Sequence, residues 1–161
     1  MARFDPPAAR HILTFAESLE GGGVERVQLR LAGAWLAAGR RVTLLLGSAD
    51  GPLAAELPDG IEIVPLRSSA YHALFAAPRH IAALGPDIIF CPGNYYTSIA
   101  AWARLRLGAK CPPIVGKVSN ALVRRDQSTI AALGYRWWLR RHPGFIDHLV
   151  AMSPALAAEA A

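Results

Sequence analysis

The chain has 161 residues, of which 53% are hydrophobic and 18% charged, which indicates about one globular domain and excludes a disordered protein. The net charge of +5 comes from residues 81–161, which hold nine basic and four acidic side chains, whereas residues 1–80 hold eight of each. This imbalance favours an anionic partner (a phosphate, a lipid surface or nucleic acid), and no apolar run reaches the ~20 residues of a membrane span.

Residues 1–10, MARFDPPAAR, form the first segment. Prolines occupy the place where a secretory signal peptide carries its apolar stretch, so we interpret the segment as the poorly ordered lead-in of a cytoplasmic protein. Cys91 and Cys111 lack the spacing of a redox or metal motif, which is typical of reduced thiols. The five histidines also lack metal-ligand spacing, and we expect no metal site.

Short apolar runs alternate with helical patterns along the rest of the chain. Six runs are predicted strands because they are apolar throughout, like parallel strands buried on both faces; they cover residues 11–15, 41–46, 61–66, 87–91, 113–118 and 148–152. Helices are expected at residues 24–38, 53–57, 70–84, 95–107 and 128–141. The alternation predicts a doubly wound, mainly parallel α/β sheet of the Rossmann type. If its strands run in the order 3-2-1-4-5-6, the first and fourth are neighbours at the switch point.

Gly21, Gly22 and Gly23 separate the first predicted strand from the first helix. A glycine turn at this place directs free backbone N–H groups and the positive end of the helix dipole at a ligand above the sheet, so we predict contact with a phosphate or sugar oxygen. The dinucleotide pattern G-x-G-x-x-G is incomplete, because Arg26 stands at its third glycine position. Glu25 and Arg26 also fit solvated positions in a first helical turn, where an acid suits the dipole.

Polar residues follow the fourth and fifth predicted strands. CPGNYYT places Asn94 and Tyr95 after the fourth strand, and Lys117, Ser119 and Asn120 end the fifth. Open α/β sheets bind ligands at the carboxyl ends of their strands, so we predict that these residues bind substrate near the glycine turn. A helix cap is an equally good interpretation for Asn94, and turn chemistry is the alternative for Ser119 and Asn120.

The stretch YRWWLRRH sets Arg136, Arg140 and Arg141 beside two tryptophans. Basic and aromatic side chains together suit an anionic membrane surface, which would place the protein at the inner face of the membrane. The alternative is an ordinary amphipathic helix with its tryptophans in the core and its arginines in solvent. No nucleic-acid-binding module is recognisable, so nucleic acid is not an expected partner.

The chain closes with MSPALAAEAA, in which Ser153 and Pro154 suit a helix start. About two helical turns follow, and isolated helices of that length are marginal. We therefore interpret the chain as part of a longer protein, with a short terminal helix docked on the sheet as the alternative.

The order of these motifs resembles the N-terminal domain of the GT-B-fold, family-4 retaining glycosyltransferases. Members typically read Gly-Gly-x-Glu-Arg after the first strand, matched here by Gly22, Gly23, Glu25 and Arg26. Further matches are GIEIVPL, PDII and HLVAMSPAL in that order, so the resemblance spans roughly residues 11–159.

The resemblance implies a two-domain enzyme that moves a sugar from a nucleotide-sugar donor to a glycan or lipid-linked acceptor with retention. Residues 11–161 would form the Rossmann-like acceptor-side domain, and a nucleotide-sugar domain would follow, so the isolated chain is expected to be inactive. No cofactor is implied besides the donor. A non-catalytic α/β module that binds a nucleotide or a phosphate is the alternative function.

The resemblance also assigns roles to individual residues. In the family the glycine loop approaches the donor diphosphate, a role that falls here to Gly22 and Gly23, with Gly21 beside them. Many members carry a histidine after the fifth strand that contacts the donor sugar. This sequence has none there, so the resemblance implies that Asn120 or Ser119 takes the catalytic position.

Overall fold

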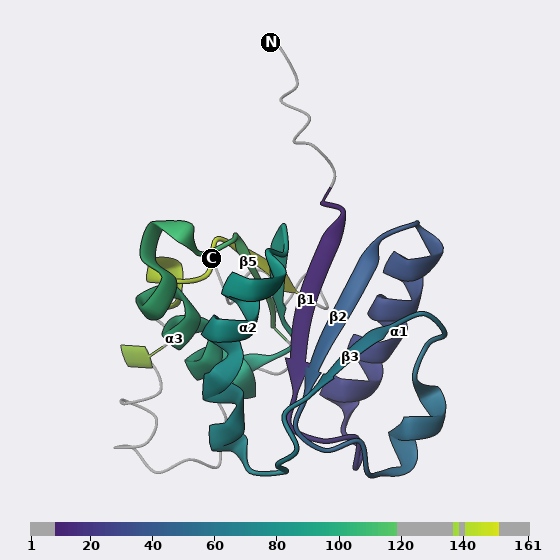
Figure 1. The fold of residues 1–161 in the computed structure, drawn as a ribbon. Coiled ribbons are helices and arrows are strands. Elements are labelled where there is room, and N and C mark those ends of the chain that lie inside the picture. The colour runs from purple at the N-terminus through teal and green to yellow at the C-terminus, as the bar shows by residue number, and fades with distance from the viewer. Residues whose placement is uncertain (1–8, 119–136, 139–140, 152–161) are drawn as a thin grey trace.

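The computed structural model describes residues 9–118, 137–138 and 141–151 (Figure 1). Within these residues, six parallel strands form one sheet in the order β3-β2-β1-β4-β5-β6, which confirms the predicted fold class and the assumed strand order. The strands are β1 (His11–Ala16), β2 (Arg41–Leu46), β3 (Glu62–Pro65), β4 (Ile88–Cys91), β5 (Ile114–Val118) and β6 (His148–Ala151). Each lies within about one residue of its predicted bounds.

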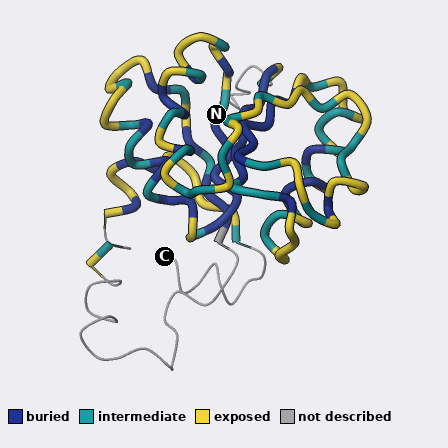
Figure 2. Tube along the Cα trace, turned by 60° about the horizontal axis from the view of Figure 1, so that its bottom comes forward, coloured by how far each residue is buried: buried dark blue, intermediate teal, exposed yellow. Residues whose placement is uncertain are grey.

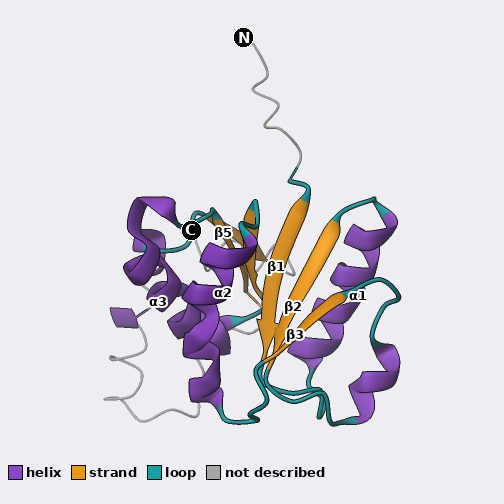
Figure 3. Ribbon diagram, viewed as in Figure 1, coloured by secondary structure: helices purple, strands orange, loops and turns teal. Residues whose placement is uncertain are grey.

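Helices cover both faces of the sheet (Figure 3). One face carries α1 (Gly23–Ala37), and the other carries α2 (Ala77–Leu84) and α3 (Thr97–Leu107). Shorter 3-10 turns lie in the connections, namely η1 (Pro52–Glu56), η2 (Tyr71–Ala76), η3 (Asn94–Tyr96), η4 (Gly108–Lys110) and η5 (His142–Gly144).

Two predicted helices are wound more tightly than expected, one throughout and one in its first part. The segment predicted as a helix at 53–57 is the 3-10 turn η1, and the helix predicted over 70–84 begins as η2. It becomes α-helical at Ala77, because Pro78 has no N–H to donate and is tolerated only in the first turn of an α-helix. The helix predicted over 128–141 lies outside the described residues, except for the helical pair Trp137–Trp138.

The core lies on both faces of the central strands. Leu13 and Phe15 of β1 face α2 and α3, whereas Ala16 faces α1. Gln28 ties α1 to the sheet, because its Nε2 donates to Thr14 Oγ1 at 2.6 Å and to the Phe15 carbonyl at 3.1 Å. This contact fixes the first turns of α1 over the end of β1, where the glycine turn lies.

The outer strands differ from the prediction that all six are buried on both faces. β1, β2 and β4 are largely buried, but β3 exposes three of its four residues and β6 also exposes three of four. Leu149 and Val150 of β6 are 42% and 49% exposed. The reason is position, since each of these strands has a neighbouring strand on one side only.

The direction of winding reverses at β1, which pairs with both β2 and β4. All six strands end at the same edge of the sheet because they are parallel. In Figure 2, turned so that this edge comes forward, the strands are mainly buried and the connecting loops are mainly exposed. Such a switch point is where open α/β sheets place their ligands.

Candidate functional site

The glycine turn lies at the switch point, between the carboxyl end of β1 and the start of α1. Gly21 has a backbone φ of +112°, which side-chain-bearing residues rarely adopt, and Gly22 is the N-cap of α1. Gly23 is the first helical residue, and a Cβ placed on it would have no heavy atom within 4 Å. All three glycines are exposed, so the first N–H groups of α1 open to solvent beside the sheet.

Three hydrogen bonds join the loop after β4 to the glycine segment, by which we mean residues 17–25. Tyr95 donates its hydroxyl to Glu17 Oε2 at 2.9 Å, and Tyr96 donates to Glu25 Oε1 at 2.9 Å. The Tyr96 oxygen in turn accepts the backbone N–H of Glu17 at 3.2 Å. The loops that follow β1 and β4 therefore face one another across the switch point.

Burial raises the pKa of both of these phenols above the ordinary value, at which a phenol is already protonated at neutral pH. Burial and the hydrogen bond to Glu17 raise the pKa of Tyr95 to about 12, although its ring is 58% exposed. Burial also raises the pKa of Tyr96, with the nearby carboxylates of Glu17 and Glu25 acting in the same direction. At neutral pH both hydroxyls remain donors to carboxylates.

Lys117 is a positively charged residue at the same edge of the sheet. It lies at the carboxyl end of β5 and is only 4% exposed. Burial lowers the pKa of its ammonium, and the negative charge of Glu25 partly opposes that shift. Within the described part of the chain, the Lys117 ammonium makes neither a hydrogen bond nor an ion pair. A charge in that position is energetically costly unless solvent, a neighbouring group or a ligand satisfies it.

We call the following residues the switch-point cluster: Glu17, Gly21, Gly22, Gly23, Glu25, Tyr95, Tyr96 and Lys117. The structure thus brings the predicted residues Tyr95 and Lys117 to the same end of the sheet as the glycine turn. Asn94 is half-buried in η3, directly before these tyrosines. It is not the N-cap of α3, because that position belongs to Tyr96. Ser119 and Asn120 lie outside the described residues.

Sequence reasoning missed Glu17 and Tyr96 and left Glu25 as a solvated residue. Glu17 carried a weak signal, since it directly follows a buried strand at the ligand-binding edge. Tyr96 and Glu25 are 71 positions apart, and no local pattern pairs them. Arg26 does behave as a surface residue, forming an ion pair with Glu56 at 3.3 Å in which both side chains are about half exposed.

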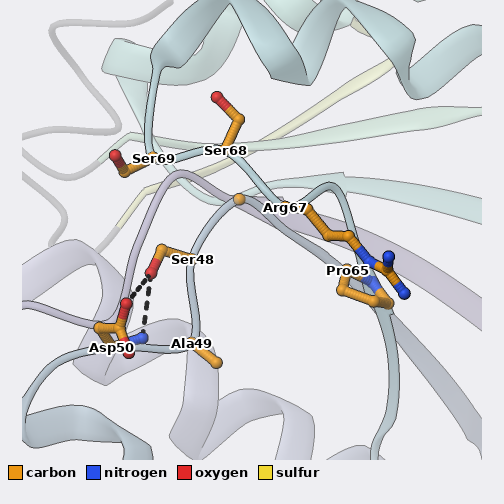
Figure 4. A pocket seen from close by; sticks show the side chains of 8 residues that line it. Ser48, Ala49, Asp50, Pro65, Arg67, Ser68 and Ser69 are labelled. Carbon is orange, nitrogen blue, oxygen red and sulfur yellow. Dashed lines mark hydrogen bonds between the residues drawn. The ribbon is translucent and has the colours of Figure 1, made fainter.

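An open pocket of about 550 Å³ lies beside the cluster, at the carboxyl ends of β2 and β3 (Figure 4). Its lining includes Ser48, Asp50, Arg67 and Ser68. Ser48 donates its hydroxyl to Asp50 Oδ2 at 2.8 Å and accepts the Asp50 N–H at 3.1 Å, so Asp50 is a turn residue. The pocket extends the polar edge of the sheet from the switch point toward β3.

The two described tryptophans of the basic stretch differ in environment. Trp138 packs against the core and donates its indole N–H to Thr97 Oγ1 at 3.0 Å. Trp137 is exposed, with the Arg141 guanidinium 4.8 Å from its ring centroid. Arg136 and Arg140 lie outside the described residues. No helix in the described part of the chain has the length and apolar character that crossing a membrane requires.

This chain matches known proteins both in its sequence family and in its fold. Residues 22–161 match the model of the glycosyl transferase 4-like domain. The chain is similar to Anabaena HepE in complex with UDP and glucose, with a TM-score of 0.64 and 18% identity over 92% of this chain and 39% of that chain. It is also similar to Acinetobacter baumannii MurG, with a TM-score of 0.58 and 20% identity over 91% of this chain and 42% of that chain. No curated protein matches.

A doubly wound parallel sheet with a glycine turn at its switch point defines a Rossmann-like domain. The chain belongs to the glycosyl transferase 4-like family, because the family model covers most of its length. The resemblance to the N-terminal domain of a GT-B fold is thereby confirmed, and the solved structures support it at the level of fold. The chain spans 39% and 42% of the length of HepE and MurG, respectively.

Proposed function

We propose that this domain is the acceptor-side half of a glycosyltransferase that moves a sugar from a nucleotide-sugar donor to a glycan or lipid-linked acceptor with retention. Membership of the glycosyl transferase 4-like family supports the reaction class. A similar fold occurs in HepE, whose structure holds UDP and glucose, and this supports a nucleotide-sugar donor. A cytoplasmic location fits such a donor.

The observation that carries the proposal is the pair of tyrosine–glutamate hydrogen bonds across the switch point. They place the exposed glycine turn opposite the β4 loop, with the buried Lys117 at the same edge. In the proposed function, the N–H groups of Gly21, Gly22 and Gly23 face an oxygen of the donor diphosphate or sugar. Lys117, Asn94 and Tyr95 contact the substrate from the β4 and β5 side.

The proposal also includes Ser119 and Asn120, which lie outside the described residues, and a second domain. Ser119 and Asn120 are proposed to take the catalytic position that the family gives to a histidine. A second, nucleotide-sugar domain is proposed to complete the site, because the chain spans only 39% of HepE and 42% of MurG. A protein of these 161 residues alone is therefore expected to show no turnover with any nucleotide sugar.

The test is Gly23→Val in the intact two-domain enzyme, assayed with a panel of UDP- and GDP-sugars by release of nucleoside diphosphate. The added side chain meets no protein atom within 4 Å of its Cβ, so it occupies the space proposed for the ligand without disturbing the fold. We expect turnover to fall by about two orders of magnitude, the size of effect seen when a reacting group is misplaced.

Gly144→Val is the matched control. Gly144 is also exposed, and its Cβ would likewise meet nothing within 4 Å, but it precedes β6 and so lies at the opposite end of the sheet. We expect this variant to be as active as the wild type and both variants to unfold at the wild-type temperature. Wild-type turnover by Gly23→Val would reduce the glycine turn to a structural role and overturn the site assignment.

A further inference from the structure

The hydroxyl of Tyr96 is the centre of the switch-point cluster. The residue is 1% exposed, and its ring packs edge-on against Phe15 of β1 with centroids 5.9 Å apart. From this fixed place its oxygen accepts the N–H of Glu17 at 3.2 Å and donates to Glu25 Oε1 at 2.9 Å. A ring that is packed on all sides cannot follow movements of the loop, so the loop is held to the ring.

These two hydrogen bonds hold both ends of the glycine segment. Glu17 is the first residue after β1, and Glu25 lies in the first turn of α1. The chain between them contains Gly21, Gly22 and Gly23, whose backbones have more freedom than those of other residues. One buried oxygen atom therefore limits the positions that the glycine turn can adopt.

The same hydrogen bond also holds a carboxylate that acts electrostatically on Lys117. Glu25 is the acid whose negative charge affects the pKa of the Lys117 ammonium, yet the two side chains form no ion pair in the described structure. The Glu25 carboxylate is instead bound to Tyr96. The position of this carboxylate, and so its effect on Lys117, is therefore fixed by the same buried hydroxyl.

We propose that Tyr96 is a positioning residue, which holds the glycine turn in its ligand-binding geometry and fixes the Glu25 carboxylate at the start of α1. The inference rests on the proposed function, because it assumes that the donor binds at the glycine turn. Tyr96 contacts no substrate in this account. Its hydroxyl acts through the Glu17 backbone and the Glu25 carboxylate, so that the donor meets a preformed site and binds without first ordering the loop.

The test is Tyr96→Phe in the intact enzyme, with Tyr71→Phe as the matched control. The Tyr71 hydroxyl also has two partners, the Tyr95 carbonyl at 2.8 Å and Ser98 Oγ at 2.7 Å, but neither belongs to the glycine segment. We expect the donor KM to rise about tenfold in Tyr96→Phe and less than about twofold in Tyr71→Phe. A purely structural role would give both variants the same loss of thermal stability and an unchanged KM.

Two variants of Glu25 keep the inference testable if Tyr96→Phe does not fold. Glu25→Gln retains a carbonyl oxygen that accepts the Tyr96 hydroxyl, and it should raise the donor KM less than Glu25→Ala does. Glu25→Ala removes the acceptor and should raise KM about as much as Tyr96→Phe does. In the double variant the two effects should not add, because both report on one hydrogen bond.

The outcomes separate this inference from the proposed function. A normal donor KM in Tyr96→Phe and Glu25→Ala, together with a strong loss in Gly23→Val, would overturn the positioning role alone. A normal KM in all three variants would overturn the ligand site at the glycine turn as well. Equal damage by Glu25→Gln and Glu25→Ala would show that the charge of Glu25 matters and not its hydrogen bond to Tyr96.

Discussion

Lys117 and Tyr96 show how far individual residues of the switch-point cluster could be predicted. Lys117 was predictable as a site residue, because a polar residue at the carboxyl end of an apolar strand has few structural reasons to be there. Its near-complete burial was not predictable, since it depends on long-range packing, including the pairing of β6 beside β5. Tyr96 gave no signal, because an aromatic residue in that position is usually a core residue.

His142 gives a pH-dependent prediction at the same scale. Burial lowers the pKa of its imidazole, and its Nε2 has no partner within the described part of the chain. An unfolded histidine takes up a proton near pH 6.5, but the folded one resists it, so the unfolded state binds more protons as the pH falls. Stability should therefore drop as the pH decreases below about 6.5, by up to about 1.4 kcal/mol per pH unit for one such group.

Urea unfolding of the intact protein between about pH 5.5 and 7.5 measures this effect. His142→Gln should flatten the decline, and His148→Gln, at an exposed position on β6, should leave it as in the wild type. Part of the slope will persist in His142→Gln, because burial also lowers the pKa of His11. An unchanged slope in His142→Gln would show that this histidine is not the titrating group.

Among the elements, the loops after β1, β2 and β3 act as one unit at the carboxyl edge. Gly47 donates its N–H to the Ala16 carbonyl at 3.0 Å and accepts the Ser68 N–H at 3.1 Å. Ser48 donates its N–H to the Glu17 carbonyl at 3.0 Å. These contacts connect the pocket at Ser48 and Ser68 to the start of the glycine segment.

Gly47→Ala tests this connection. A Cβ at Gly47 would collide with the backbone carbonyl oxygens of Glu17 and Ser68, the second at 2.6 Å, and backbone atoms cannot move aside as a flexible side chain can. We expect a loss of about 1–3 kcal/mol in the free energy of unfolding. Gly144→Ala, at an open position, should unfold like the wild type in the same urea titration. Equal midpoints for the two variants would mean that the three loops move independently.

The type of an element was predictable where the helical spacing of apolar residues continues over many residues, as in α1. It was least predictable where the chain forms 3-10 turns. The sequence pattern of η1 and η2 has helical spacing, but spacing alone does not separate a 3-10 turn from an α-helix in segments of five or six residues. The burial of strands was predictable for β1 and β2 and wrong for β3 and β6. Apolar composition does not tell which strands lie at the edges.

For the whole molecule, the sheet type followed from the alternation of strands and helices, and its strand order is the usual one of a doubly wound sheet. Membrane contact remains a proposal at this scale. The exposed Trp137 with Arg141 above its ring supports it, since both groups suit the interface of an anionic bilayer.

The corresponding prediction uses vesicles. Replacing Arg136, Arg140 and Arg141 with Gln should weaken binding to vesicles that contain phosphatidylserine by about two orders of magnitude at low salt. The effect should fade at high salt because of screening. The control replaces Arg30, Arg79 and Lys110, which are exposed elsewhere, and thus removes the same charge. Equal binding of the wild-type protein to neutral and anionic vesicles would reject the proposed contact.

The unequal edges of the sheet have a consequence for handling the domain in the laboratory. The edge at β3 carries Pro65, which has no N–H to offer, and Glu62, whose carboxylate is bound by Arg41 at 2.8 Å. Proline and charge of this kind discourage further strand pairing. The edge at β6 has neither, and it presents the exposed side chains of Leu149 and Val150. In concentrated solutions the separate domain should therefore self-associate through β6. Val150→Lys is the first substitution to try for preventing this association.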